Sequence, residues 1–354
     1  MMQGRNIQEL AMEVKRMEET KRDFIADTSL VDAVVVDRAP AISLRVPEID
    51  YSERFGMTDV FHQQISSNLG IPYKYYNRMV QEAPNLWMYN VNHWLHEKPE
   101  RKMIRTLDGN ARAMRSPGYR RLDNYGLMGA ILPVLAKTDM IVRSAEVTER
   151  KLWLKASFPS KSFEVKKGDV VEIGLAISNS EVGLGYVRVD PLVMRLVCLN
   201  GAVINDAAIK QIHVGRADGQ DGVIQELLSS KTQSLEDAAF WSKVRDVVEA
   251  FVGNGHGDRM REKIERSLGL EIKKPDATVK VMAKENGLGD QEADSILGYL
   301  ISGGDLSAWG LGQAVSRFSQ DGHDYDRATQ LEHLAGNIIT LPQSEWKFLE
   351  EANN

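Results

Sequence analysis

Residues 101–124 read RKMIRTLDGNARAMRSPGYRRLDN and predict a β-hairpin that leads through a turn into a helix. Asp108-Gly109 is a strong hairpin-turn signal between two short strand-like runs. Serine, proline and glycine at 116–118 end the second run, and residues 119–137 then follow a helical pattern. The order strand, strand, helix indicates an α+β fold.

Outward from this hairpin, the periodicity predicts a mixed, mainly antiparallel sheet flanked by helices, with a mostly helical C-terminal region. We divide the chain into an N-terminal helix and extended arm (1–50), an α+β core domain (51–215), a linker (216–235) and a helical C-terminal region (236–354). Within these parts, the predicted helices include 5–25 and one that starts near Ser234, and the predicted strands include 140–148 and 151–158.

The composition favours a folded protein. The chain has 354 residues, 43% of them apolar, which is ample for a packed core, and a formal net charge of −6. No run of about 18 apolar residues occurs, so no membrane span is expected. The single cysteine, Cys198, cannot form an intrachain disulfide and favours a reducing cytoplasm. Without a GxxxxGK[ST] loop, we expect neither ATP-driven activity nor a cofactor.

Candidates for metal binding and nucleophilic catalysis are weak. His93 and His96 stand three residues apart with Glu97 beside them, but neither HExxH nor a cysteine pair accompanies them. We therefore predict solvated or tryptophan-packed histidines rather than a metal site. Cys198 lies in the apolar run LVMRLVCLNG, where a cysteine is usually a small buried residue. No catalytic residue is predicted.

A local basic strip stands out in this acidic chain. It sets seven cations against the single acid Asp108: Arg101, Lys102, Arg105, Arg112, Arg115, Arg120 and Arg121. Arg105 and Arg112 are expected near each other across the hairpin, where like charges destabilise the sheet unless an anion neutralises them. Arg195 likewise lies in a core-like strand and needs a partner. That partner is either a carboxylate of the chain, such as Asp123, or a phosphate, which arginine can bind bidentately.

Aromatic residues interleave with the strip, among them Tyr119 and Tyr125. Most aromatic side chains belong to a core. Arginines beside exposed aromatics on a sheet are, however, also the pattern by which single-stranded nucleic acid is held, through phosphate contacts and base stacking. The sequence therefore leaves two interpretations of the strip: an internal ion-pair network, or a surface that binds single strands.

Several segments resemble the phage/plasmid-like protein family, the domain of unknown function 932. They are NLGIPYKYYNRM (68–79), VNHWL (91–95), IRTLDGNARAMRSPGYRRLDN (104–124), MRLVCLNG (194–201) and SAWGLGQAVSRFS (307–319). The family element S-x-x-Y-R-x-L-D-N corresponds to Ser116, Tyr119, Arg120, Asp123 and Asn124, and the element R-L-V-C-x-N to Arg195, Cys198 and Asn200. The resemblance implies a protein of a phage or plasmid, without an established reaction.

The leading hypothesis is a cytoplasmic, ATP-independent protein that binds single-stranded nucleic acid, with strand annealing as one candidate activity. The N-terminal helix and a sheet edge would mediate homo-oligomerisation. The alternative is an enzyme or binding protein for a small phosphate ligand, with Asp123 as candidate base in a Tyr/Arg/Asp pocket; a third is an interaction protein for counter-defence. The predicted anion-binding residues are Arg105, Arg112, Arg115, Tyr119, Arg120, Arg121, Asp123, Asn124, Arg195 and Asn200.

Overall fold

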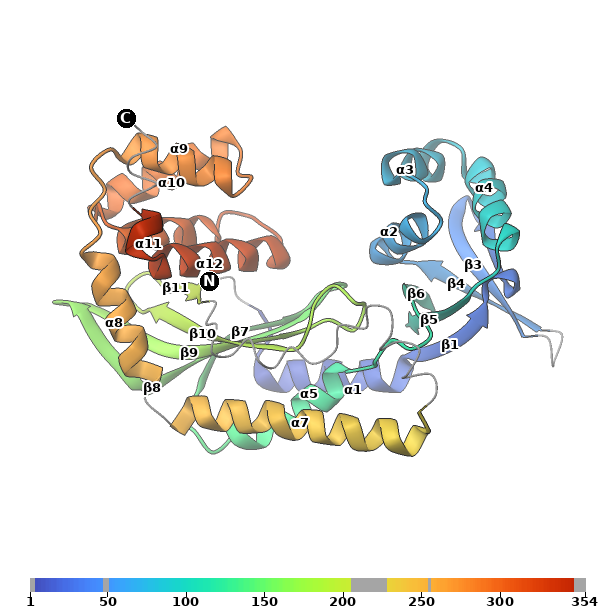
Figure 1. Cartoon of the computed structure of the whole chain (residues 1–354), viewed down its shortest axis with the longest axis horizontal. Helices are drawn as coiled ribbons and strands as arrows, with labels where there is room; N and C mark the ends of the chain where they lie inside the picture. Colours follow the sequence, from blue (N-terminus) through green and yellow to red (C-terminus); the bar gives the residue numbers. More distant parts are fainter. Residues whose placement is uncertain (1–3, 47–50, 205–227, 254–255, 347–354) are drawn as a thin grey trace.

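A computed structural model describes residues 4–46, 51–204, 228–253 and 256–346. It confirms the α+β class: two mainly antiparallel sheets lie in two lobes, and the C-terminal region is helical. Figure 1 shows the two lobes rising on either side of a lower layer that contains α1, α5 and α7. The predicted single sheet of residues 51–215 is therefore divided, because the hairpin joins one sheet and the later strands form the other.

The first lobe contains six of the described strands in the order β1-β5-β6-β4-β3-β2. All neighbours are antiparallel except β4 and β6. The strands are β1 (Arg22–Asp27), β2 (Val31–Val36), β3 (Ala39–Val46), β4 (Tyr51–Met57), β5 (Arg101–Leu107) and β6 (Asn110–Arg115). A short 3-10 turn, η1 (Thr28–Leu30), links β1 to β2, and three helices pack on this sheet: α2 (Asp59–Asn68), α3 (Tyr73–Glu82) and α4 (Pro84–Glu97).

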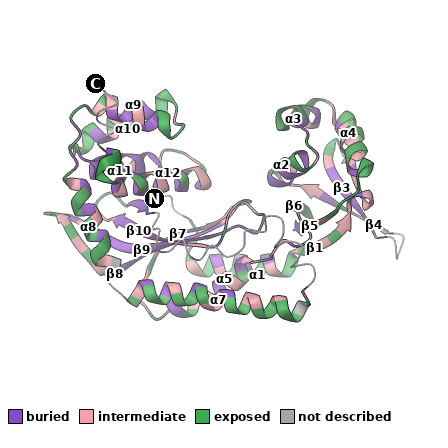
Figure 2. Ribbon diagram, viewed as in Figure 1, coloured by how far each residue is buried: buried purple, intermediate pink, exposed green. Residues whose placement is uncertain are grey.

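The second lobe is built on five of the described strands, each antiparallel to its neighbours. They are β7 (Ile141–Val147), β8 (Leu152–Lys166), β9 (Asp169–Asn179), β10 (Arg188–Arg195) and β11 (Asn200–Val203). Nearly every residue of β9 is buried, because helices cover both faces of the sheet (Figure 2). Gly336 allows one of them to approach closely, since a Cβ there would lie 1.9 Å from the Val203 carbonyl oxygen.

The remaining helices complete the lower layer and the second lobe. They are α1 (Ile7–Thr20), α5 (Asn124–Leu135), α7 (Ser230–Gly253), α8 (His256–Leu268), α9 (Pro275–Glu285), α10 (Asp290–Gly303), α11 (Ala308–Phe318) and α12 (Tyr325–Thr340). Helix α1 buries Leu10, Val14 and Met17 and contacts α5 and β7. The apolar face of α1 is thus used within the chain.

The hairpin prediction is confirmed in detail. Asp108 and Gly109 have φ values of 51° and 74°, the left-handed backbone that a two-residue hairpin turn requires. The helix predicted over 5–25 ends at Thr20, because residues 22–27 pair with β5 instead. The helix predicted near Ser234 begins earlier, at Ser230, so the end of the predicted linker is helical; the rest of that linker lies largely outside the described residues.

Within the described part of the chain, no helix combines the length and apolarity needed to cross a bilayer.

Candidate functional site

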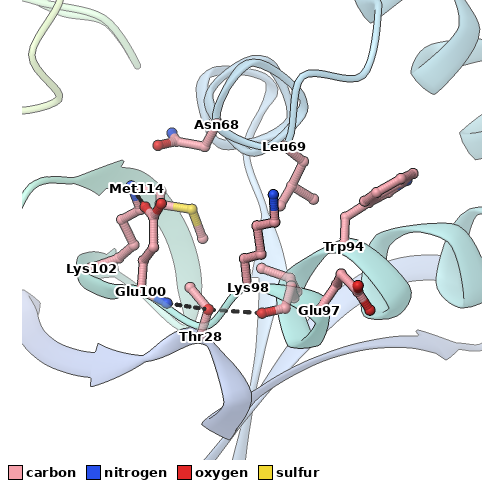
Figure 3. A pocket seen from close by; sticks show the side chains of 10 residues that line it. Thr28, Asn68, Leu69, Trp94, Glu97, Lys98, Glu100, Lys102 and Met114 are labelled. Atoms are coloured by element: carbon pink, nitrogen blue, oxygen red, sulfur yellow. Dashed lines mark hydrogen bonds and ion pairs between the residues drawn. The ribbon is translucent and has the colours of Figure 1, made fainter.

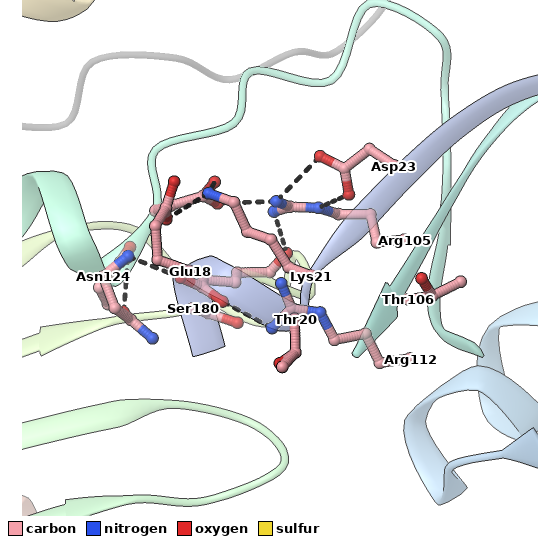
Figure 4. Close-up of polar contacts among 12 residues, drawn as sticks. Glu18, Thr20, Lys21, Asp23, Arg105, Thr106, Arg112, Asn124 and Ser180 are labelled. Atoms are coloured by element: carbon pink, nitrogen blue, oxygen red, sulfur yellow. Dashed lines mark hydrogen bonds and ion pairs between the residues drawn. The ribbon is translucent and has the colours of Figure 1, made fainter. Parts of the chain in front are cut away.

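Arg105 is the centre of an ionic junction between the two lobes (Figure 4). Its side chain is fully buried. Its Nε donates to Asp23 Oδ1 at 2.8 Å, and its Nη2 donates to Asp123 Oδ1 at 2.7 Å. Its Nη1 donates to the backbone carbonyl of Glu181 at 2.8 Å. A single guanidinium therefore links β5 to β1, to the start of α5 and to the segment after β9.

Arg112 reaches the same acceptor residue. A register shift between β5 and β6 leaves Arg112 as an extra residue opposite the Arg105–Thr106 step, and such a bulge re-aims a side chain. Arg112 Nη1 donates to Glu181 Oε2 at 2.5 Å, and both side chains are buried. The expectation that Arg105 and Arg112 lie close together is thus met, with Glu181 between them.

Glu181 and Asp123 have different roles at the start of α5. The backbone N–H of Asn124 donates to Glu181 Oε1 at 2.6 Å, so Glu181 satisfies a free donor of the helix N-terminus. Asp123, at the N-cap position, makes no capping hydrogen bond. Its carboxylate instead accepts from Arg105 and, at 2.5 Å, from Lys21 Nζ. Asn124 Oδ1 accepts from Asn179 Nδ2 at 3.0 Å, which ties α5 to the second sheet.

The electrostatics of Asp123 do not suit a general base. Burial alone would raise the pKa of its carboxyl, but Arg105 and Lys21 outweigh burial and hold the pKa below its ordinary value. Both carboxylate oxygens are occupied by cations. A general base works best with a pKa near the working pH and a lone pair that can reach the substrate. The geometry therefore argues against the role of Asp123 as candidate base.

Three of the predicted phosphate-binding arginines, besides Arg120 described below, form close pairs with carboxylates of the chain. Arg105 and Arg112 belong to the junction, and Arg195 donates from Nε to Asp169 Oδ1 at 2.6 Å. Burying an arginine without a counter-charge is costly, so the fold supplies carboxylates at these positions. This corrects the expectation that the whole strip faces an anionic ligand.

The arginines in and beside the turn after β6 are less completely paired than Arg105 and Arg112. Arg121 is 45% exposed, and its nearest carboxylate, Asp23, lies 3.9 Å away. Arg120 donates from Nε to Asp237 Oδ1 at 2.8 Å and stacks on Phe240, whereas its Nη2 is buried and has no partner among the described residues. Arg115 stacks over the Tyr119 ring, 5.2 Å from its centroid. The turn thus keeps cationic donors available beside an aromatic ring.

These side chains surround a pocket of about 270 Å³, here named the turn pocket. Strand β5, the turn and the first part of α7 line it, through Arg101, Tyr119, Arg120, Arg121, Gln233 and Asp237. Gln233 and Asp237 were not predicted, because nothing local in the sequence shows that α7 packs against a turn more than a hundred residues away. The half-exposed Tyr125 is not among the residues that line this pocket.

Arg195 and Asn200 lie elsewhere. Together with Cys198 they line a second pocket, against α10 and α11. The structure therefore places Tyr119 and Arg120 in one pocket and Arg195 and Asn200 in another. Cys198 is exposed at the turn between β10 and β11, contrary to the expectation of a buried residue, because β10 ends at Arg195 and the chain leaves the sheet there.

A third pocket, of about 220 Å³, lies between α2 and α4 (Figure 3). It combines the 47% exposed Trp94 with Lys98 and Lys102, but Glu97 and Glu100 balance their charge. The neighbouring histidine His96 lies 3.1 Å from the Val31 carbonyl oxygen, and His93 packs on Trp94. Across the described residues, no group of three or more potential metal-ligating side chains is found.

Comparison with known proteins adds one finding. Residues 115–246 match the model of a family described as Domain of unknown function (DUF932). No curated protein and no solved structure matches the chain. The match begins at the last residue of β6 and ends in α7, so it includes the turn, Asp123 and the Arg195 element, whereas SAWGLGQAVSRFS lies beyond it. The resemblance to this domain of unknown function is thereby confirmed for residues 115–246.

Proposed function

We propose that the protein binds single-stranded nucleic acid without ATP, through phosphate contacts in the turn pocket. The observation that carries this proposal is the convergence of Arg101, Arg120 and Arg121 on one pocket beside Tyr119. Arginine presents its N–H donors in a fork that matches two phosphate oxygens, and the ring adds a surface on which a base can stack.

Arg120 contributes the strongest support. Its side chain is 17% exposed, and its contacts with Asp237 and Phe240 fix the orientation of the guanidinium. One of its nitrogens, Nη2, remains without a partner among the described residues. An unsatisfied buried donor costs about 1–3 kcal/mol, so a phosphate oxygen that reaches it would recover that free energy.

The proposal also implies how strongly binding should depend on salt. Only the three arginines that line the turn pocket are proposed to contact phosphate, because Arg105 and Arg112 are buried against carboxylates and do not line it. For single strands, the slope of log affinity against log salt is about −0.7 per phosphate contact, so a slope of about −2 is expected. A strip in which six arginines all met phosphates would give a slope of about −4.

The second candidate is binding of a small phosphate ligand, such as a mononucleotide. It is favoured by Gln233 and Asp237 on α7, which line the turn pocket together with residues of β5 and the turn. A pocket bounded in this way fits one phosphate and its attached group more readily than a long strand. The two candidates share the same arginines and differ in whether a polymer is required.

The test is fluorescence anisotropy with a labelled single-stranded oligonucleotide, its duplex, and an unlabelled mononucleotide as competitor, over a salt series from about 50 to 200 mM. We expect single-strand binding that weakens about 20-fold over this range. Arg121→Ala should reduce it, while Arg78→Ala, which changes an exposed arginine on α3, should not. Competition by the mononucleotide would favour the second candidate. Absence of single-strand binding at low salt would refute the first candidate, and a labelled mononucleotide that also fails to bind would refute the second.

Origin from a phage or plasmid, annealing activity, cytoplasmic location and homo-oligomerisation remain proposals attached to this function. A strand-annealing assay with two complementary oligonucleotides tests the annealing activity, and light scattering of the purified chain tests homo-oligomerisation. The counter-defence alternative predicts a large apolar patch on the C-terminal helices. Among the described residues from α7 onward, the large exposed hydrophobic side chains are Leu235, Ile301 and Leu306, which does not favour it.

A further inference from the structure

Two of the segments that carry the family resemblance play no part in the turn pocket. MRLVCLNG forms the end of β10 and the start of β11, and SAWGLGQAVSRFS forms α11. They meet at a pocket of about 320 Å³, which α10 also lines. This volume is within the range of small-molecule sites. The pocket, here named the Cys198 pocket, is defined by Arg195, Cys198, Leu300, Trp309, Gln313 and Arg317.

Two of these side chains carry unsatisfied polar atoms. Gln313 is 6% exposed and Trp309 is 1% exposed. Neither Oε1 of Gln313 nor Nε1 of Trp309 has a hydrogen-bond partner among the described residues. A buried indole N–H usually finds an acceptor, and each orphaned group costs about 1–3 kcal/mol. A molecule that offers both a donor and an acceptor at this pocket would satisfy the two groups together.

Two arginines line the same pocket, and each is held in place by the protein. Arg195 donates from Nε to Asp169 at 2.6 Å. Arg317 lies over the Tyr299 ring, with its Cζ 5.1 Å from the centroid, and its Nη1 is 3.4 Å from Asp321. Each uses one guanidinium nitrogen on its carboxylate, which leaves other N–H groups that donate to no described residue. Fixed arginine forks of this kind match a carboxylate or a phosphate.

The rest of the lining is mostly apolar. Leu300, Trp309 and Ala314 present hydrocarbon and ring surface to the pocket. Asp305, the acid in the lining, is paired with Lys166 at 2.8 Å, so it does not oppose an anion with a free charge. A flat, largely apolar body with a few placed polar atoms suits such a wall.

We propose that the Cys198 pocket binds a small organic anion in which a planar ring with a hydrogen-bond donor and acceptor carries a phosphate or a carboxylate. The ring packs on the apolar wall and satisfies Gln313 and Trp309, and the anionic group binds Arg195 and Arg317. This site is separate from the turn pocket, and its existence does not depend on nucleic-acid binding there.

Cys198 provides a direct measure of occupancy. It is the single cysteine of the chain, it is exposed, and it lines the pocket. The rate at which iodoacetamide, a small neutral reagent, alkylates the intact protein is measured with AMP, CMP, p-aminobenzoate or inorganic phosphate present. We expect at least one ring-bearing probe to slow alkylation severalfold in a saturable manner. Whether the nucleotides or p-aminobenzoate protect distinguishes a phosphate from a carboxylate ligand.

Matched variants assign the protection to this pocket. Gln313→Met removes the amide oxygen at similar volume, and Arg317→Gln removes a guanidinium that is 42% exposed. Both should abolish protection, which is measured for each variant as the ratio of its alkylation rates with and without the probe. Arg121→Ala, in the turn pocket, should retain it. The proposal is overturned if no ring-bearing probe protects Cys198, if inorganic phosphate protects equally well, or if both pocket variants keep full protection.

Discussion

Arg105 on β5 and Asp123 at the start of α5 lie 2.7 Å apart and connect the two lobes of the protein. The pair is almost completely buried, and Asp23, Lys21 and Glu181 complete its surroundings. A buried ion pair of this kind contributes less net stability than its charges suggest, but removing one partner leaves the other uncompensated. The pair therefore holds the two lobes in one arrangement, and Arg105 is neutralised without a bound ligand.

Arg105→Met should be strongly destabilising. The substitution leaves Asp23 and Asp123 buried without their shared cation, and the expected loss is about 3–5 kcal/mol of unfolding free energy. Urea denaturation followed by circular dichroism measures it. Arg78→Ala, which breaks an exposed pair on α3, serves as control and should leave the midpoint unchanged. A loss for Arg105→Met no larger than that of the control would show that the junction is not structural.

Substitutions of Arg120 and Arg121 should distinguish a structural role in this turn from a role in ligand binding alone. Arg120→Ala removes the contact with Asp237 and the stack on Phe240, so the first turns of α7 should exchange their amide hydrogens faster. Arg121→Ala removes a 45% exposed side chain and should change stability by less than about 0.5 kcal/mol. Hydrogen-exchange mass spectrometry compares the two. Equal hydrogen exchange in α7 for both variants would contradict the proposed role of Arg120 in holding α7 against the turn.

His333 should make stability depend on pH. Burial, helped by Arg188 and Lys155, lowers the pKa of this histidine from its ordinary value to about 3. Between that value and about 6.5, the unfolded chain binds a proton that the folded chain does not, so stability falls as pH falls through this window, by about 1.4 kcal/mol per pH unit. Thermal unfolding from pH 7 to pH 4 measures the slope.

His333→Gln is the control for that slope. The amide does not titrate, so the variant should lose this part of the pH dependence while its stability near pH 7 changes only through packing. A variant whose unfolding curves follow those of the natural chain at every pH would show that another group is responsible.

Gly336→Ala should disrupt the packing of α12 on β11. The added Cβ would lie 1.9 Å from the Val203 carbonyl oxygen, a backbone atom that cannot move without distorting the strand. Overpacking of this kind costs about 1–3 kcal/mol or more. Gly298→Ala on α10 is the matched control, because nothing lies within 4 Å of its Cβ and alanine favours a helix. Chemical denaturation should show opposite signs for the two variants, and equal effects would argue against the close approach.

The sequence predicted local structure well where backbone chemistry decides it. The Asp108-Gly109 turn depends on left-handed backbone angles that these residues tolerate. Sequence-based prediction failed where a segment fits both a helical and a strand pattern. Residues 22–24 continue a helical pattern, yet they pair with β5, and a partner distant in sequence decides between the two outcomes.

The sequence by itself established the α+β class, the hairpin and the unusual cluster of arginines, because these follow from nearest-neighbour preferences and from composition. Only the tertiary structure decided what each arginine does. Arg105, Arg112 and Arg121 belong to the same basic strip, but the first two are buried against Asp23 and Glu181 and the third is half exposed. Whether an arginine is neutralised internally depends on carboxylates that approach from other strands, and that approach is a property of the packed lobes rather than of the chain near each arginine.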